Sequence, residues 1–226
     1  MSGRAAEKAA TDLRQQILRL ANAGAAAKLS LEGAVLTVRD GGEVRTLDMA
    51  KVGPLMGEGV FDPPTTPLDK NGQGVPYATY AFAAQMATVE VDLELGTVKV
   101  LRIVAAHDVG KAINPTLVEG QIEGGIAQGL GLALMEEYLP GRTENLHDYL
   151  IPTVGDMPEI ESILIEDREP LGPSGAKGIG EPALVPTAPA ILGAIDNATG
   201  VRMRRVPVLP HRLREAILAK GKGRAS

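Results

Sequence analysis

Residues 172–182 read Gly-Pro-Ser-Gly-Ala-Lys-Gly-Ile-Gly-Glu-Pro, a glycine-rich loop that leads into a carboxylate, a proline and an apolar run over 183–198. Because proline favours the first position of a helix, Glu181 is expected at or just before a helix N-terminus. Glycines let the backbone approach a ligand closely or adopt a positive φ. The stretch therefore predicts one acid at the end of a pocket-lining loop, either as a catalytic group or only as a helix cap.

Composition narrows the classes of function. The 226 residues suffice for one large domain or two small ones. A net charge of −5 and an aromatic content of 3% argue against a surface that tracks phosphates or stacks bases, so nucleic acid is not an expected partner. The chain has no cysteine, which excludes disulfides and Cys-ligated metal sites within it, and its three histidines lack metal-ligand spacing. With no candidate membrane span or signal peptide, we expect a soluble cytoplasmic protein that contacts no membrane.

Hydrophobic periodicity predicts the elements of an α+β fold, a mixed antiparallel sheet with packed helices. Helices are expected over 5–21, 115–138, 183–198 and 210–220, a hairpin over 30–49, and strands over 77–95, 98–104 and 159–166. A long Pro- and Gly-rich connection covers 51–76, and the tail 221–226 is expected to be disordered. Because neither a repeat nor a clear linker is visible, residues 1–226 are treated as one compact unit.

The predicted helix over 115–138 is unusual because it contains five glycines, at positions 120, 124, 125, 129 and 131. Each glycine should cost roughly 1 kcal/mol relative to alanine inside a helix, so close approach of the backbone to something must offset that cost. Two explanations stay open. The helix packs tightly against a sheet, or Gln121 and its glycine neighbours form a wall of a cofactor site.

Several chemistries lack the groups that they require. There is no nucleophile elbow with a histidine partner, as a serine hydrolase needs, and no second acid in a comparable loop, as a glycosidase needs. The glycine spacing from Gly175 to Gly180 matches neither the dinucleotide fingerprint nor the P-loop, and an acid follows it directly. These residues favour a single general base beside a cofactor that is carried by glycine-rich backbone.

Six motifs occur in one order along the chain. They are Asp108-Val-Gly, Ile113-Asn-Pro, Gly120-Gln-Ile-Glu-Gly, Gln128-Gly-Leu-Gly, Ile151-Pro-Thr and Gly175-Ala-Lys-Gly-Ile-Gly-Glu-Pro. Together they resemble the molybdenum hydroxylases, the xanthine dehydrogenase and aldehyde oxidoreductase family, in the C-terminal part of the molybdopterin-binding subunit. The resemblance covers nearly all of the chain and implies the fold of that C-terminal domain.

The resemblance also implies roles for individual residues. Glu181 matches the family glutamate that acts as general base toward a hydroxide on molybdenum. Gln121 matches the glutamine that hydrogen-bonds an oxygen ligand of the metal or the pterin. Lys177, Gly178 and Gly180 match the loop that lines the site, as backbone contacts to the cofactor. The pterin dithiolene holds the molybdenum in this family, so no metal ligand is expected from the protein.

The family subunits are several times longer than this chain, which implies partners. We expect an upstream molybdopterin-binding subunit, an iron–sulfur subunit with [2Fe-2S] clusters and a subunit with FAD, in an oxidoreductase active only as a hetero-oligomer. The expected cofactor is molybdenum-molybdopterin, including its cytosine dinucleotide form. The expected substrate is a purine, a nicotinate-like N-heteroaromatic or an aldehyde.

Two alternatives to this function stay open, and so does the origin of the short length. The chain could be a non-catalytic structural subunit of such a complex, or an anion-binding module that uses the Gly175–Gly180 loop alone. The length fits either a naturally split subunit or a truncated piece.

Overall fold

The structure is a computed structural model that describes residues 1–223. Their contacts form two compact units, residues 1–78 with 171–173, and residues 79–170 with those from 174 onward. The interpretation of residues 1–226 as one cofactor-binding unit stays a prediction. Each unit has its own hydrophobic cluster, so each is described by itself.

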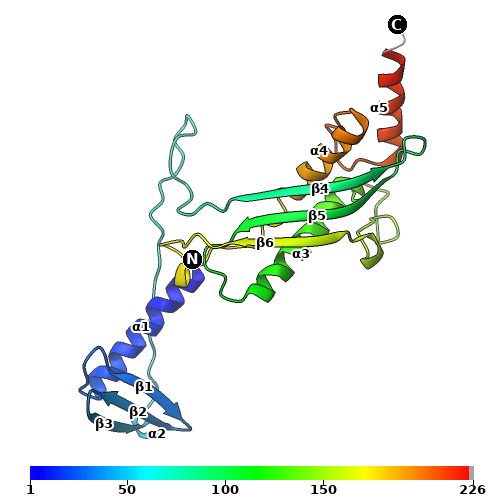
Figure 1. Cartoon of the computed structure of the whole chain (residues 1–226). Coiled ribbons are helices and arrows are strands. Elements are labelled where there is room, and N and C mark those ends of the chain that lie inside the picture. The colour runs from blue at the N-terminus through cyan, green and yellow to red at the C-terminus, as the bar shows by residue number, and fades with distance from the viewer. Residues whose placement is uncertain (224–226) are drawn as a thin grey trace. The chain divides into compact units, whose positions relative to one another are not determined.

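The first unit combines a helix with a small antiparallel sheet (Figure 1). Its elements are α1 (Ser2–Leu20), β1 (Lys28–Glu32), β2 (Val35–Asp40), β3 (Glu43–Asp48) and α2 (Met49–Val52). The predicted hairpin is confirmed, with Asp40 paired to Glu43 and Gly41 at a φ of +60° in its turn. The structure adds β1, which the sequence did not separate, as a third strand beside β2. Leu18 packs with Leu36 and Val38 in the core of this unit.

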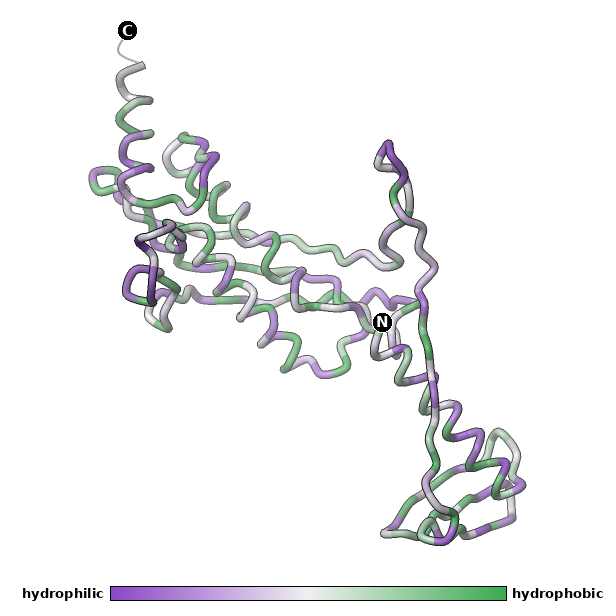
Figure 2. The backbone as a smooth tube through the Cα atoms, turned by 180° about the vertical axis from the view of Figure 1, so that it is seen from behind, coloured by the Kyte–Doolittle hydropathy of each residue, from purple (hydrophilic) through white to green (hydrophobic). Residues whose placement is uncertain are grey.

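The long connection over 51–76 contains no strand or long helix, as the sequence predicts. It follows α1 closely, because Cβ atoms at Gly57 and Gly59 would lie 2.2 and 2.3 Å from backbone atoms of Ala9. Farther along, Thr66 and Val75 form an isolated bridge, and the tip of the loop between them is hydrophilic (Figure 2).

The second unit is a three-stranded sheet covered by helices. Its order is β4-β5-β6, with β4 (Ala83–Val91) antiparallel and β6 (Glu159–Ile165) parallel to the central β5 (Val98–Asp108). The chain passes from β5 to β6 through α3 (Pro115–Leu134), a crossover that a parallel pair requires. The other elements are α4 (Thr187–Thr199), α5 (Pro210–Gly223) and the short 3-10 helices η1 (Val154–Asp156) and η2 (Pro173–Gly175). The predicted mixed α+β fold is confirmed.

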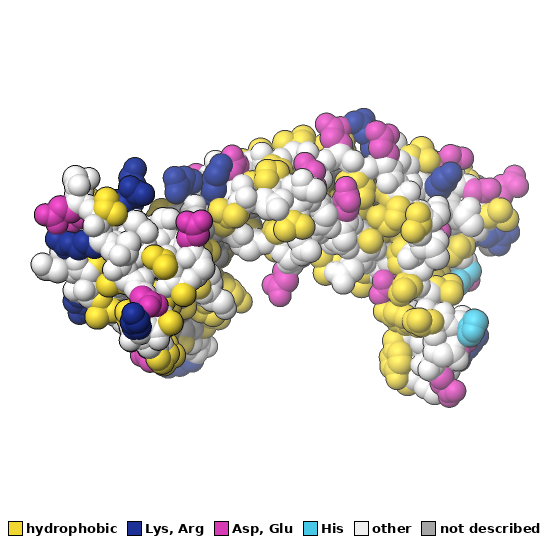
Figure 3. Space-filling model, turned by 90° about the horizontal axis from the view of Figure 1, so that it is seen from below, with side chains coloured by type: hydrophobic (Ala, Val, Ile, Leu, Met, Phe, Trp, Pro, Cys, Tyr) yellow, Lys and Arg dark blue, Asp and Glu magenta, His cyan; other side chains and the backbone are white. Residues whose placement is uncertain are grey.

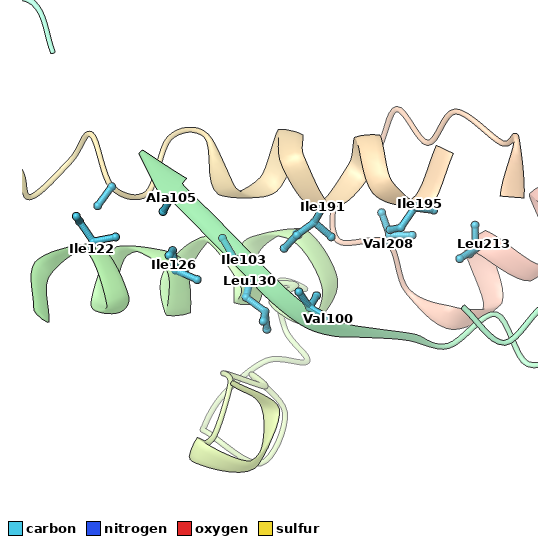
Figure 4. Close-up of a cluster of buried hydrophobic side chains, with 12 residues drawn as sticks. Val100, Ile103, Ala105, Ile122, Ile126, Leu130, Ile191, Ile195, Val208 and Leu213 are labelled. Carbon is cyan, nitrogen blue, oxygen red and sulfur yellow. The ribbon is translucent and has the colours of Figure 1, made fainter. Parts of the chain in front are cut away.

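The core of the second unit lies between the sheet and two helices (Figure 4). Ile122, Ile126 and Leu130 recur at four-residue spacing along α3, so they share one face and pack toward β5. Ile191 and Ile195 do the same from α4, and both are fully buried. This packing holds α3 and α4 on one face of the sheet.

Several boundaries differ from those predicted. The strand expected over 77–95 covers only Ala83–Val91, and the one expected over 98–104 extends to Asp108. Helix α5 continues through Gly223, which includes three residues of the segment expected to be disordered; residues 224–226 lie outside the described residues. No helix within residues 1–223 is long and apolar enough to span a bilayer.

Candidate functional site

The end of β5 and the glycine loop form one structure. The Lys177 amide donates to the Val109 carbonyl at 2.9 Å, and the Lys111 amide donates to the Gly175 carbonyl at 2.7 Å. Gly110 and Ala176 form an antiparallel bridge between these hydrogen bonds. The Asp108-Val-Gly motif and the glycine loop are thus two sides of one backbone ladder.

Gly110 is required at this ladder for two reasons. Its φ is +63°, a conformation that side chains other than hydrogen disfavour. A Cβ built on it would lie 2.4 Å from the Gly175 carbonyl oxygen, which is closer than the two atoms can approach. The glycine of this motif therefore permits the loop to dock on the strand end.

A buried ion pair joins the same two segments. The Lys177 ammonium bonds the Asp108 carboxylate, and the two side chains are 7% and 9% exposed. The Lys177 ammonium also lies 5.9 Å from the centre of the Phe82 ring. Burial by itself raises the pKa of Asp108. The hydrogen bonds from Lys177 and the Gly110 amide, together with the charge of Lys177, lower this pKa by more than burial raises it, so the net shift is downward.

The Gln121 side chain and the backbone that leads into Glu181 are brought to one place. A Cβ built on Gly180 would lie 3.8 Å from the Gln121 Oε1 atom, so the glutamine side chain lies beside the residue that precedes Glu181. The side chains of Gln121 and Glu181 are both exposed. An open pocket of about 220 Å³ adjoins Gln121, and its wall also contains Val109, Asn114, Leu117, Lys177 and Ile179.

The other predicted contacts occupy two different environments. Gly178 and Gly180 are exposed, and no atom lies within 4 Å of the position that a Cβ of Gly178 would take. Their backbone is open to a ligand. The Lys177 side chain is not, since it is committed to Asp108.

The predicted helix start at Glu181 is wrong. Helix α4 begins at Thr187, and residues 181–186 form turns in which the Leu184 amide donates to the Glu181 carbonyl at 3.0 Å. Pro182 and Pro186 have no amide hydrogen to continue a helical ladder through this segment. Glu181 is therefore neither a helix cap nor placed at the positive end of α4.

The glycines of α3 fall into two sets. Gly125, Gly129 and Gly131 are buried, and Cβ atoms on the first two would lie 2.5 Å from the Ala183 Cβ and 2.4 Å from the Thr187 Cβ. No such neighbour lies within 4 Å of Gly120 or Gly124, which are exposed. Gly125 and Gly129 pack against the segment after Glu181, whereas Gly131 packs against Glu136 and Pro152. The exposed set leaves the backbone beside Gln121 open.

A buried polar cluster behind the loop was not predicted from the sequence. Gln85 of β4, His107 of β5 and Thr187 of α4 are linked by hydrogen bonds, and the last two are fully buried. The one signal was polar side chains on the inward side of otherwise apolar strands. Among residues 1–223, no group of three or more His, Asp or Glu side chains could hold a metal ion.

Comparisons with known proteins agree on one family. Residues 1–158 match the family described as a molybdopterin cofactor-binding domain, a match that ends before the glycine loop. The chain is 41% identical over 141 residues to the xanthine dehydrogenase molybdenum-binding subunit of Escherichia coli O157:H7, which covers 60% of this chain and 19% of that protein. It therefore spans about a fifth of the length of this curated relative.

Solved structures share the fold. The aldehyde oxidoreductase from Desulfovibrio gigas matches with a TM-score of 0.71 and 34% identity, over 75% of this chain and 19% of that one. Quinoline 2-oxidoreductase from Pseudomonas putida 86 matches with a TM-score of 0.69 and 29% identity, over 92% of this chain and 28% of that one.

Proposed function

Because this chain belongs to the molybdenum hydroxylase family, as part of its molybdopterin-binding region, we propose that it forms one wall of a molybdenum cofactor site and supplies Glu181 as the general base. The proposed reaction is hydroxylation of an electron-poor carbon in an N-heteroaromatic compound or an aldehyde. One observation carries the proposal: Gln121 and the Gly180-Glu181 peptide, distant in sequence, lie side by side.

The residues at this place fit a cofactor that brings its own metal ligands. The Gln121 amide offers a hydrogen-bond donor in the open, and Gly178 and Gly180 leave backbone N–H groups accessible. Gly120 and Gly124 leave room beside Gln121 for a bulky group. When bound, the molybdenum cofactor supplies the redox chemistry and the oxygen that enters the product.

Each protein group has a separate task in this proposal. The Gln121 amide holds an oxygen atom of the cofactor, and the backbone of Lys177, Gly178 and Gly180 shapes the wall around it. The Glu181 carboxylate accepts the proton that is lost as the new C–O bond forms. Proton transfer to a positioned carboxylate typically contributes about 10²- to 10⁴-fold in rate.

Substrate class and partners are proposed from the relatives. The D. gigas and P. putida structures are named for an aldehyde and for quinoline, which favours these two classes of electron-poor carbon. Large hydrophobic side chains remain exposed on both units, among them Val60, Phe82, Leu146, Val154 and Val185 (Figure 3). We propose that further molybdopterin-binding, [2Fe-2S] and FAD segments cover such surfaces. We also propose that the bound cofactor is the cytosine dinucleotide form of molybdopterin.

The anion-binding alternative is less well supported. A nearby cation would strengthen phosphate binding by this loop, but the ammonium of Lys177 is buried against Asp108. The exposed carboxylate of Glu181 would repel an anion at the end of the same loop.

The proposal is tested by Glu181→Gln in the assembled, molybdenum-loaded complex. We expect kcat to fall by about 10²- to 10⁴-fold while KM and molybdenum content stay close to wild type, because only proton acceptance is lost. Steady-state kinetics and metal analysis measure these quantities. Glu215→Gln, which makes the same change at an exposed position of α5, should leave all three unchanged. Full turnover by the Glu181→Gln complex would instead support a non-catalytic structural role.

A further inference from the structure

The proposed base stands at the start of a turn that is held by backbone hydrogen bonds. Within residues 1–223 the Glu181 carboxylate has no hydrogen-bond partner, and the side chain is exposed. The position of its carboxylate therefore depends on the turn that follows, where the Glu181 carbonyl accepts the Leu184 amide at 3.0 Å and the Leu184 carbonyl accepts the Thr187 amide at 3.2 Å.

Two sides of the second unit fix this turn. On the α3 side, Gly125 contacts Ala183 and the Leu184 amide nitrogen so closely that no side chain fits, and Gly129 does the same at Thr187. On the sheet side, the Gln85 Nε2 atom donates to the Ala183 carbonyl at 3.1 Å. The turn after Glu181 is thus clamped between a helix backbone and one amide side chain of β4.

The Gln85 side chain is itself oriented by two buried groups. The Thr187 hydroxyl donates to the Gln85 Oε1 atom at 2.8 Å, and Gln85 Nε2 lies 3.1 Å from His107 Nε2. Since the amide nitrogen has two hydrogens, it can donate one to Ala183 and one to an unprotonated His107 Nε2. Burial lowers the pKa of His107 and so favours its neutral form. Nε2 accepts in the neutral tautomer that carries its proton on Nδ1, an atom that is buried without a hydrogen-bond partner among the described residues.

We propose that Gln85 is a positioning residue for Glu181, with Thr187 and His107 setting the orientation of its amide. The inference rests on the proposed function of Glu181, which none of the three side chains contacts. Gln85 forms hydrogen bonds with both ends of the turn, with the Ala183 carbonyl and with the Thr187 hydroxyl. It thereby fixes the backbone from which the Glu181 carboxylate reaches the proposed cofactor. Small displacements of a catalytic group are costly, about 10²-fold in rate for roughly 1 Å.

The hydroxyl of Thr187 gives the sharpest test in the assembled, molybdenum-loaded complex. Thr187→Val keeps the shape but removes the donor, so we expect kcat to fall about tenfold with KM within about twofold of wild type. Amide exchange in residues 181–187, followed by mass spectrometry, should become about tenfold faster. Thr187→Ser retains the hydroxyl and should restore both quantities. Thr88→Val removes an exposed hydroxyl from the same sheet and should change neither.

Gln85→Leu removes the Thr187–Gln85 hydrogen bond from the strand side, together with the bonds to Ala183 and His107, and should slow kcat at least as much as Thr187→Val. Thr187→Val leaves those two bonds in place but also removes the contact of the hydroxyl with the Ala183 carbonyl at 3.3 Å. Wild-type kinetics and exchange in Gln85→Leu and Thr187→Val would overturn the proposal, and so would a loss of kcat without faster exchange in 181–187. If the Leu184 amide of the wild-type complex exchanges as fast as an exposed amide, the proposed role of Gln85 is wrong, even if the variants fail to assemble. If Glu181→Gln retains turnover, the proposed base is wrong, yet the exchange data still show whether Gln85 holds the turn.

Discussion

At the scale of single residues, Lys177 shows how one side chain can serve a site without touching its ligand. The motif places this lysine in the loop that lines the pocket, yet its ammonium is buried against Asp108 and faces Phe82. Its backbone amide meanwhile bonds the Val109 carbonyl. The lysine therefore fastens the glycine loop to the end of β5, and neither its ammonium nor its amide is free for the proposed contact with the cofactor.

This ion pair predicts a stability that depends on pH. The pKa of Asp108 is lowered in the folded chain, so the pair contributes its full stability above the ordinary carboxyl pKa of about 4 and loses it as pH falls through the folded value. Lys177→Met leaves a buried charge without its partner and should cost about 3–5 kcal/mol at pH 7. The loss should shrink at acid pH, where Asp108 becomes protonated.

Denaturant unfolding of the full chain at pH 7 and near pH 4 measures this difference. Lys111→Met is the matched control, because Lys111 pairs with Glu166 at 3.0 Å but both side chains are more than two-fifths exposed. Its loss should stay within about 1 kcal/mol. Equal losses in the two variants would show that burial adds nothing to the Asp108–Lys177 pair.

At the scale of elements, α3 carries glycines in two different environments, one buried and one exposed. Asn114 caps its start by accepting the Leu117 amide at 3.2 Å, and Pro115 occupies its first turn, so the helix begins where the sequence predicts. Of the two explanations of its glycines, the structure bears only on tight packing. The buried glycines do pack tightly, but Gly125 and Gly129 pack against residues 183–187 and not against the sheet. A cofactor wall at the exposed glycines stays a proposal.

The two sets of glycines predict opposite effects of the same substitution. Gly125→Ala would place a Cβ 2.5 Å from the Ala183 Cβ, so we expect it to destabilise the chain by about 1–3 kcal/mol. Gly124→Ala meets no neighbour and should stabilise it by about 0.5–1 kcal/mol, since alanine favours a helix. Unfolding free energies of the two variants decide the matter. A similar change in both would mean that the contact at Ala183 is not tight.

At the scale of the whole molecule, the described chain has two hydrophobic cores. One contains Leu18, Leu36 and Val38, and the other contains the isoleucines of α3, β5 and α4. The sequence suggested one unit because it shows neither an internal repeat nor a clear linker. The first unit has a small core for its length, and small cores provide little stability by themselves.

Two cores predict separate unfolding. Val38→Ala removes methyl groups from a fully buried site of the first unit and should lower its stability by roughly 1–3 kcal/mol. Amide hydrogen exchange should then accelerate in residues 28–48 and stay unchanged in β5 and α3. Faster exchange in both regions by the same factor would instead support the single unit that the sequence suggested.

The sequence by itself determined the type of most elements and the family. The signals for these elements are local, such as the alternation of apolar and charged residues over 89–95 and the helix start at Asn114-Pro115. The family motifs are likewise contiguous runs of sequence. For the same reason the pairing of Gln121 with Glu181 came from the resemblance, since nothing local relates residues so far apart.

Only the tertiary structure decided which distant groups meet. In the structure, β6 pairs in parallel with β5, and α4 begins at Thr187. Lys177 is buried against Asp108. Hydrogen bonds join Gln85 to His107 and Thr187 beside the turn that follows Glu181. The physical reason is that local preference fixes only which way a residue faces along its own element. Which group a residue then contacts depends on packing between elements that are far apart in the sequence, as for Lys177 with Asp108 and Gln85 with Thr187.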